Sequence, residues 1–136
     1  MVTNTKISVR YAETDQMQIA HHSNYAVWFE AGRTDFIKAH GISYTDIEKA
    51  GIILPLISLE CQYKKAAFYE DELIVETKLT KVTNTKLTFT YRVLRGEEVI
   101  STGSTVHGIV DSKLRPIRLK RDFAKYYEFF KNAMSE

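Results

Sequence analysis

The chain has 136 residues, 44% of them hydrophobic, which is the length of one ordinary domain with enough apolar material for one core. We therefore expect a single domain over residues 1–136. The 19 Lys and Arg side chains and 17 Asp and Glu side chains alternate along the chain, so nucleic acid is not an expected partner. No segment approaches the roughly 18 consecutive apolar residues that span a bilayer. Because Cys61 is the single cysteine and cannot form an intramolecular disulfide, we expect a soluble, cytoplasmic protein with Cys61 buried.

The first part of the chain predicts a strand, a loop and a long helix. Residues 6–11 alternate between apolar and polar side chains, which is typical of a half-buried strand. The polar stretch 13–23 predicts a loop, and Ser23–Asn24 supplies side chains that can cap a helix beginning there. Apolar residues recur at helical spacing over 25–39, and Gly41 ends the helix.

The rest of the chain predicts mainly strands. Residues 43–51 indicate one short capped helical turn. Four segments rich in Val, Ile, Thr and aromatic residues follow, and we expect them to be successive antiparallel strands: 52–67, 73–81, 86–95 and 99–110. Residues 122–134 carry aromatic side chains at helical spacing and predict a C-terminal amphipathic helix.

This order of elements predicts an α+β fold. One five-stranded antiparallel sheet should carry the long helix on one face. The strands are apolar enough that the sheet and its edges would gain from a partner chain, so a homodimer is expected.

The segment between the first strand and the long helix carries the chemistry. Asp15 lies in a loop just ahead of the helix start, where unpaired backbone amides and the positive end of the helix dipole gather. A carboxylate there could attack a carbonyl, or deprotonate an attacking water, while the amides stabilise the developing oxyanion. An Asp in such a loop is more often a cap or a turn former, so its position alone leaves both interpretations open.

A set of spaced residues adds a family resemblance. The set is Thr14-Asp15, His22, Asn24-Tyr25, Glu30 and Arg33. In order and spacing it resembles the signature of the 4-hydroxybenzoyl-CoA thioesterase family of hotdog-fold acyl-CoA thioesterases, and the similarity extends over about residues 6–120. The resemblance implies a hotdog fold, in which an antiparallel sheet wraps around a central helix. It also implies dimers with active sites at the subunit interface.

The resemblance also implies roles for particular residues. Asp15 corresponds to the catalytic carboxylate, acting as nucleophile through a mixed anhydride or as general base. The backbone amide of His22 takes the position that polarises the thioester carbonyl, and its side chain can orient substrate or water. Tyr25 is expected at the pocket wall. Lys86 is the preferred cation for CoA phosphates, because it opens a strand at a turn that in similar proteins lies near the nucleotide.

Some positions carry further expectations. The family usually has Gly where this chain has Gln18, and a positive φ angle there would cost Gln18 conformational energy. His21 and His22 are adjacent and should point in different directions, which argues against a metal site. His107 is expected to be a strand histidine with its hydrogen bonds satisfied. Glu30 is expected to pair with Arg33 or reach a loop.

The implied activity is hydrolysis of an acyl- or aryl-CoA thioester, or of an acyl-carrier-protein thioester, without a metal or redox cofactor. The implied assembly is a homodimer or a homotetramer built from dimers. Two alternatives stay open. One is a hotdog dehydratase or hydratase that uses His22 for proton transfer at carbon, and the other is a non-catalytic module that binds acyl-CoA. Acyl chain length and aromatic preference do not follow from the sequence.

Overall fold

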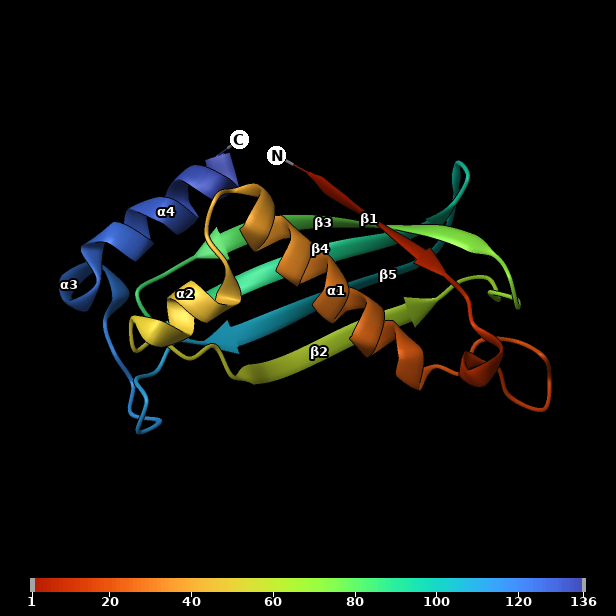
Figure 1. Ribbon diagram of the computed structural model, residues 1–136, viewed down its shortest axis with the longest axis horizontal. Helices are drawn as coiled ribbons and strands as arrows, with labels where there is room; N and C mark the ends of the chain where they lie inside the picture. Colours follow the sequence, from red (N-terminus) through yellow and green to blue (C-terminus); the bar gives the residue numbers. More distant parts are fainter. Residues whose placement is uncertain (1, 136) are drawn as a thin grey trace.

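A computed structural model, which describes residues 2–135, has one antiparallel sheet with a long helix lying across one face (Figure 1). The strands are β1 (Thr3–Ser8), β2 (Leu56–Tyr63), β3 (Glu72–Val82), β4 (Lys86–Arg95) and β5 (Glu98–Gly108). The helices are α1 (Ser23–Ala39), α2 (Tyr44–Lys49), α3 (Leu119–Asp122) and α4 (Ala124–Ser135), with a short 3-10 turn η1 (Tyr11–Glu13). The predicted α+β class and five-stranded antiparallel sheet are confirmed.

The order of the strands differs from the predicted succession. β3, β4 and β5 follow one another, but β2 pairs with β5, with Leu56 opposite His107 and Tyr63 opposite Ser101. β1 pairs with β3 at the other edge, giving the order β1-β3-β4-β5-β2. The prediction of four successive strands was wrong at β2, because segment 64–71 runs from β2 at one edge of the sheet to β3, next to the other edge, and is not a hairpin turn.

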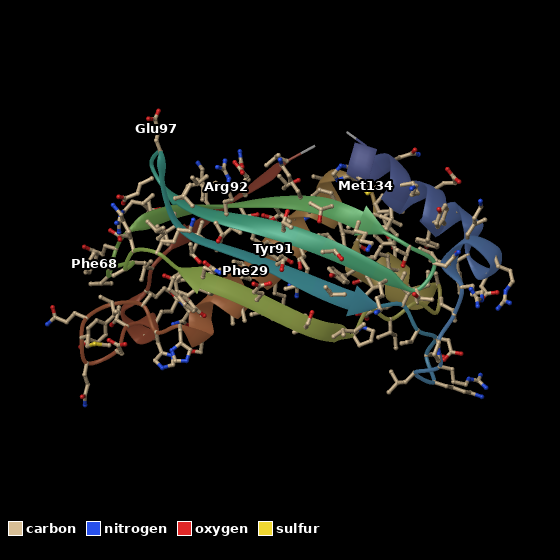
Figure 2. The ribbon with its side chains drawn as sticks, turned by 180° about the vertical axis from the view of Figure 1, so that it is seen from behind. Phe29, Phe68, Tyr91, Arg92, Glu97 and Met134 are labelled. Atoms are coloured by element: carbon tan, nitrogen blue, oxygen red, sulfur yellow. The ribbon has the colours of Figure 1, made fainter. Side chains whose placement is uncertain are left out.

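Helix α1 packs closely against the sheet through its middle. A Cβ atom on Gly32 would collide with the Thr77 side chain on β3, so only glycine allows this approach. Phe29 stacks on Tyr91 of β4, with ring centroids 4.3 Å apart and planes 6° apart. Trp28 is almost fully buried beside them. Among residues 2–135 no helix covers the opposite face of the sheet, the face that Figure 2 shows.

The ends of two elements differ from the prediction. The first strand is Thr3–Ser8 rather than 6–11, and Tyr11 is 76% exposed in η1. The cause is Glu13, whose side chain accepts from the backbone N–H of Arg10 (2.8 Å) and closes the 3-10 turn. Helix α1 begins at Ser23, and the side chain of Asn24 does not cap it but donates to backbone carbonyls.

Strand β2 lies at an edge of the sheet and is exposed over nearly its whole length. Cys61 is therefore half-buried instead of buried as predicted, with its Sγ 3.4 Å from Ser101 Oγ. At the other end of the molecule α4 packs against β3 and follows α3 directly (Figure 1). Among residues 2–135 no helix has the length and apolar character to cross a membrane.

Candidate active site

The loop that carries Asp15 is a tight hairpin. Thr14 pairs with Ala20 across it, and the Asp15 N–H donates to the Ile19 carbonyl (2.9 Å). The Asp15 side chain stays within the turn, where its Oδ1 accepts from the Met17 N–H (2.8 Å). One carboxylate oxygen is thus held by the turn, which leaves the other oxygen to act on a ligand.

The turn depends on a left-handed residue. The Gln18 N–H donates to the Asp15 carbonyl (2.9 Å), and Gln18 has a φ of 67°. The positive φ angle considered for Gln18 is therefore present, and it is the conformation that glycine adopts at least cost.

Two neighbouring segments fix the hairpin in place. The Ala20 N–H donates to the carbonyl of the buried Ala67 (2.8 Å), and Ile19 pairs with Phe68. On the other side the His21 N–H donates to the Glu13 carbonyl (2.8 Å). Asp15 is therefore placed by η1 on one side and by the segment after β2 on the other.

Glu13 links this loop to helix α1. Its side chain is buried and accepts from Trp28 Nε1 (3.1 Å) as well as from Arg10. Burial raises the pKa of Glu13, but the hydrogen bonds from Arg10 and Trp28 outweigh it and hold the pKa below its ordinary value. The sequence prediction missed Glu13. The available signal was Trp28, whose indole N–H needs an acceptor on the buried face of the helix.

The start of α1 offers one unused donor. The N–H groups of Ser23, Asn24 and Tyr25 reach His21 Nδ1, the His21 carbonyl and the His22 carbonyl, at 3.2, 3.1 and 3.2 Å. Within residues 2–135 the His22 N–H makes no hydrogen bond. The amide that the resemblance assigned to the thioester carbonyl is thus the one left open at the positive end of the helix dipole.

A cavity of about 330 Å³ brings together three of the four predicted site residues. Asp15, His22 and Tyr25 all line it, and Tyr25 is 3% exposed. The hairpin supplies Asp15, whereas the first turn of α1 supplies Tyr25.

Tyr63, at the end of β2, completes the wall. Its ring meets Tyr25 edge-on, with centroids 4.9 Å apart, and its hydroxyl donates to the His22 carbonyl (3.4 Å). Partial burial and the neighbouring Cys61 raise the pKa of Tyr63 to about 12. The prediction missed this residue, because Tyr63 reaches the cavity only through the pairing of β2 with β5.

Lys86 does not join this cavity within one chain. It opens β4 opposite Gly108, at the end of the sheet where β2 begins, whereas the cavity lies at the end of β2. The lysines at the cavity are Lys64 and Lys65, and Lys65 Nζ forms an ion pair with Glu98 (2.7 Å).

His21 and His22, the two histidines at the site, lie side by side. The rings of His21 and His22 lie together, with centroids 4.0 Å apart, so the expectation that they diverge was wrong. The described part of the chain has no group of three or more His, Cys, Asp or Glu side chains that could hold a metal ion.

The hydrogen bonds of His107 are satisfied as expected, by Thr105 Oγ1 (3.0 Å) and the Leu54 carbonyl. Burial and the nearby Arg33 charge lower the pKa of His107 to about 4.

Arg33 belongs to the core rather than to the cavity. It donates to the Tyr91 hydroxyl (3.1 Å), which lies 2.6 Å from Thr105 Oγ1, and Thr105 in turn meets His107. With His107 neutral, the hydrogen bonds of this network can all run in one direction, each group donating to the next from Arg33 to His107. The network ties α1 to β4 and β5, while Glu30, which could have paired with Arg33, is exposed.

Comparisons with known proteins agree with this architecture. Residues 17–102 match the family model described as the Thioesterase superfamily, a match that begins two residues after Asp15. YneP of Bacillus subtilis, a candidate acyl-CoA thioesterase, is 36% identical over 97% of each chain. The acyl-CoA thioesterase YbgC of Haemophilus influenzae is 24% identical over 92% of this chain and 93% of its own.

A solved structure of a thioesterase has the same fold. The DHNA-CoA thioesterase from Staphylococcus aureus superposes with a TM-score of 0.92 and 38% identity, over 98% of this chain and 91% of that one. The hotdog fold and the enzyme class implied by the family resemblance are confirmed. The chain belongs to the thioesterase superfamily.

Proposed function

We propose that this protein hydrolyses acyl-CoA thioesters, with Asp15 as nucleophile or general base and the His22 backbone amide as donor to the carbonyl oxygen. The observation that carries the proposal is the cavity at the start of α1, which Asp15 and His22 line together. Membership in the thioesterase superfamily and the named activity of the Staphylococcus aureus relative support it.

Both roles of Asp15 lead to the same products. As a general base, Asp15 takes a proton from water, the water oxygen bonds to the carbonyl carbon and the carbon–sulfur bond breaks. As a nucleophile, a carboxylate oxygen displaces the thiolate, and water then hydrolyses the mixed anhydride. In each case the His22 N–H stabilises negative charge on the carbonyl oxygen, and the proton released from water returns to the thiolate to give free CoA and the acid.

We further propose that the working form is a homodimer formed through β2. The strand is an exposed edge with the apolar side chains Leu56, Ile57 and Leu59, and such an edge pairs readily with a second strand. Antiparallel pairing of two β2 strands sets the Leu56 end of one beside the Tyr63 end of the other. Lys86 lies at the Leu56 end, so each cavity would receive the partner's Lys86 for CoA phosphates. The cytoplasmic location, a homotetramer built from two dimers and the use of acyl carrier protein stay predictions.

Thiol release from a panel of acyl- and aryl-CoA esters tests the proposed chemistry. Asp15→Asn keeps an oxygen that can accept from the Met17 N–H, so the turn is preserved while the carboxylate is lost. We expect kcat to fall about 10²- to 10⁴-fold. Asp111→Asn is the matched control, because Asp111 also accepts backbone N–H groups in a turn but does not line the cavity.

Two results would overturn the proposed function. Asp15→Asn could hydrolyse the best ester as fast as the parent, in which case Asp15 is not catalytic. Alternatively, the parent could hydrate an enoyl-CoA without releasing thiol and lose that activity in His22→Ala, which would indicate a hydratase.

A further inference from the structure

One segment near the C-terminus departs from the alternation of charges along the chain. Residues 112–121 contain five of the 19 Lys and Arg side chains and none of the 17 Asp and Glu side chains. The rest of the chain therefore holds 14 cations against 17 anions, so the net positive charge comes from this segment. All five cations are exposed, and we call them the basic cluster: Lys113, Arg115, Arg118, Lys120 and Arg121.

The basic cluster lies on the connection from β5 to α3 and on α3 itself. Figure 1 shows this connection projecting beyond the end of β5, at the end of the sheet opposite the Asp15 hairpin. Two buried side chains of the segment, Ile117 and Leu119, anchor it to the core. The Leu119 N–H also donates to the Asn84 carbonyl (2.9 Å) in the turn between β3 and β4. The cluster is therefore presented by a fixed part of the domain.

The connection contains a tight turn that carries an apolar residue among the cations. Asp111 closes the turn, because its Oδ1 accepts from the N–H groups of Lys113 and Arg115 (both 2.9 Å). The Leu114 N–H donates to the Asp111 carbonyl (2.9 Å). Leu114 has a φ of 63° and is 67% exposed. Glycine or asparagine would adopt this left-handed conformation at lower cost than leucine.

Leu114 is unfavourable in this turn both for its backbone and for its contact with water. The other residues with a side chain and a positive φ in the described part of the chain are polar, Gln18 and Glu70. Backbone strain that the fold does not require is a sign of function. An exposed apolar side chain with cations on both sides is typical of segments that bind anionic bilayers. Nucleic acid would engage the cations, but it offers no apolar layer for Leu114.

We propose that the basic cluster and Leu114 form a docking surface for an anionic phospholipid bilayer. Leu114 enters the boundary between the headgroups and the acyl chains, while Lys113 and Arg115 on either side contact lipid phosphates. The other cations of the cluster add to the attraction between the protein and the negative surface. Docking in this way does not involve the chemistry at Asp15, which lies at the other end of the sheet (Figure 1).

Co-sedimentation of the whole protein with lipid vesicles tests the role of the cations. The parent should bind vesicles in which about half of the lipid is phosphatidylglycerol and should not bind vesicles of phosphatidylcholine alone, and added salt should weaken the binding. Arg115 and Arg121 each form an ion pair with a neighbouring Asp, so the variants change the two lysines. Lys113→Gln and Lys120→Gln should each weaken the binding about 5-fold. Lys78→Gln, a change at an exposed lysine of β3 outside the cluster, should leave the binding unchanged.

Leu114→Asn separates docking from folding. Asparagine adopts the left-handed conformation more readily than leucine, so the free energy of unfolding should stay the same or rise. Binding to the phosphatidylglycerol vesicles should nevertheless fall about 5- to 10-fold, because the apolar contact with the bilayer is lost. Val27→Asn is the matched control, since Val27 is an exposed apolar residue of α1, and it should not change the binding.

The docking surface would be overturned if the parent did not bind phosphatidylglycerol vesicles. Equal binding by Leu114→Asn and the parent would also overturn it, and would leave only a site for polyanions such as nucleic acid. Displacement of the parent from the vesicles by free CoA would assign the cations to CoA phosphates instead. A changed sedimentation coefficient of Leu114→Asn without lipid would assign Leu114 to an interface between copies. None of these measurements follows thiol release, so their failure leaves the proposed function untouched.

Discussion

The turn that presents Asp15 depends on an unfavourable backbone conformation at Gln18. Gln18 adopts a φ of 67°, so it pays the cost of the left-handed conformation in order to close the turn that presents Asp15. This cost is about 1–2 kcal/mol for a residue with a Cβ atom. Glycine would avoid it, but glycine also loses more backbone entropy on folding, about 0.5–1 kcal/mol. The two effects nearly offset each other, with the strain the larger.

We therefore expect Gln18→Gly to raise the free energy of unfolding by up to about 1 kcal/mol, and Gln18→Val to lower it by about 1–2 kcal/mol. Denaturant titration of both variants measures the change. Gln16→Gly is the matched control in the same hairpin, because Gln16 does not have a positive φ and should only lose stability. Gln18→Gly behaving like Gln16→Gly would show that the left-handed conformation carries no strain.

At the scale of elements, helix α1 is positioned by its contact with β3 at Gly32. In an exposed helix, replacing glycine with alanine gains about 1 kcal/mol of helix propensity. Here the added Cβ would collide with Thr77 and come within 3.1 Å of Val75 Cγ1. Overpacking of this kind costs about 1–3 kcal/mol, so the packing cost exceeds the propensity gain.

Gly32→Ala should accordingly lower the free energy of unfolding by about 1–2 kcal/mol, as measured by thermal or denaturant unfolding. Thr77→Ala in the same chain removes the colliding hydroxyl, which has no hydrogen-bond partner among the described residues, and should restore most of the loss. If the double variant is no more stable than Gly32→Ala, the close approach at Thr77 is not the cause.

The elements also show where prediction from the sequence succeeds. Residues 86–95 alternate clearly and form β4 with those bounds, because alternation is a local property. Asp15, His22 and Tyr25 were selected by the family resemblance of a short motif, and because they lie close together in the sequence they also line one cavity. β2 pairs with β5, which is distant in the sequence, and this pairing places Tyr63 at the cavity. No local pattern encodes that pairing.

At the scale of the whole molecule, the proposed dimer determines whether the site is complete. Within one chain the cavity and Lys86 lie at opposite ends of the sheet. Antiparallel pairing of two β2 strands would bring the sheet end that carries Lys86 in one chain toward Asp15 of the other chain.

Ile57→Lys places a charge on the exposed β2 edge and should convert the dimer to a monomer, which the sedimentation coefficient measures. Val27→Lys, a change at an exposed position of α1, should leave the sedimentation coefficient of the dimer unchanged.

If each site is shared between two chains, mixed dimers of two variants give a sharper test of the proposed dimer. Asp15→Asn and Lys86→Ala homodimers should each be impaired, the second mainly through a raised KM for CoA esters. In a heterodimer of the two variants, one cavity carries both changes and the other carries neither. Co-expression with two affinity tags and purification through both isolates that heterodimer, which should regain about half of the parental kcat/KM per dimer, because site number sets the rate. A heterodimer whose kcat/KM equals the mean of the two homodimers would show that Lys86 does not serve the partner's cavity.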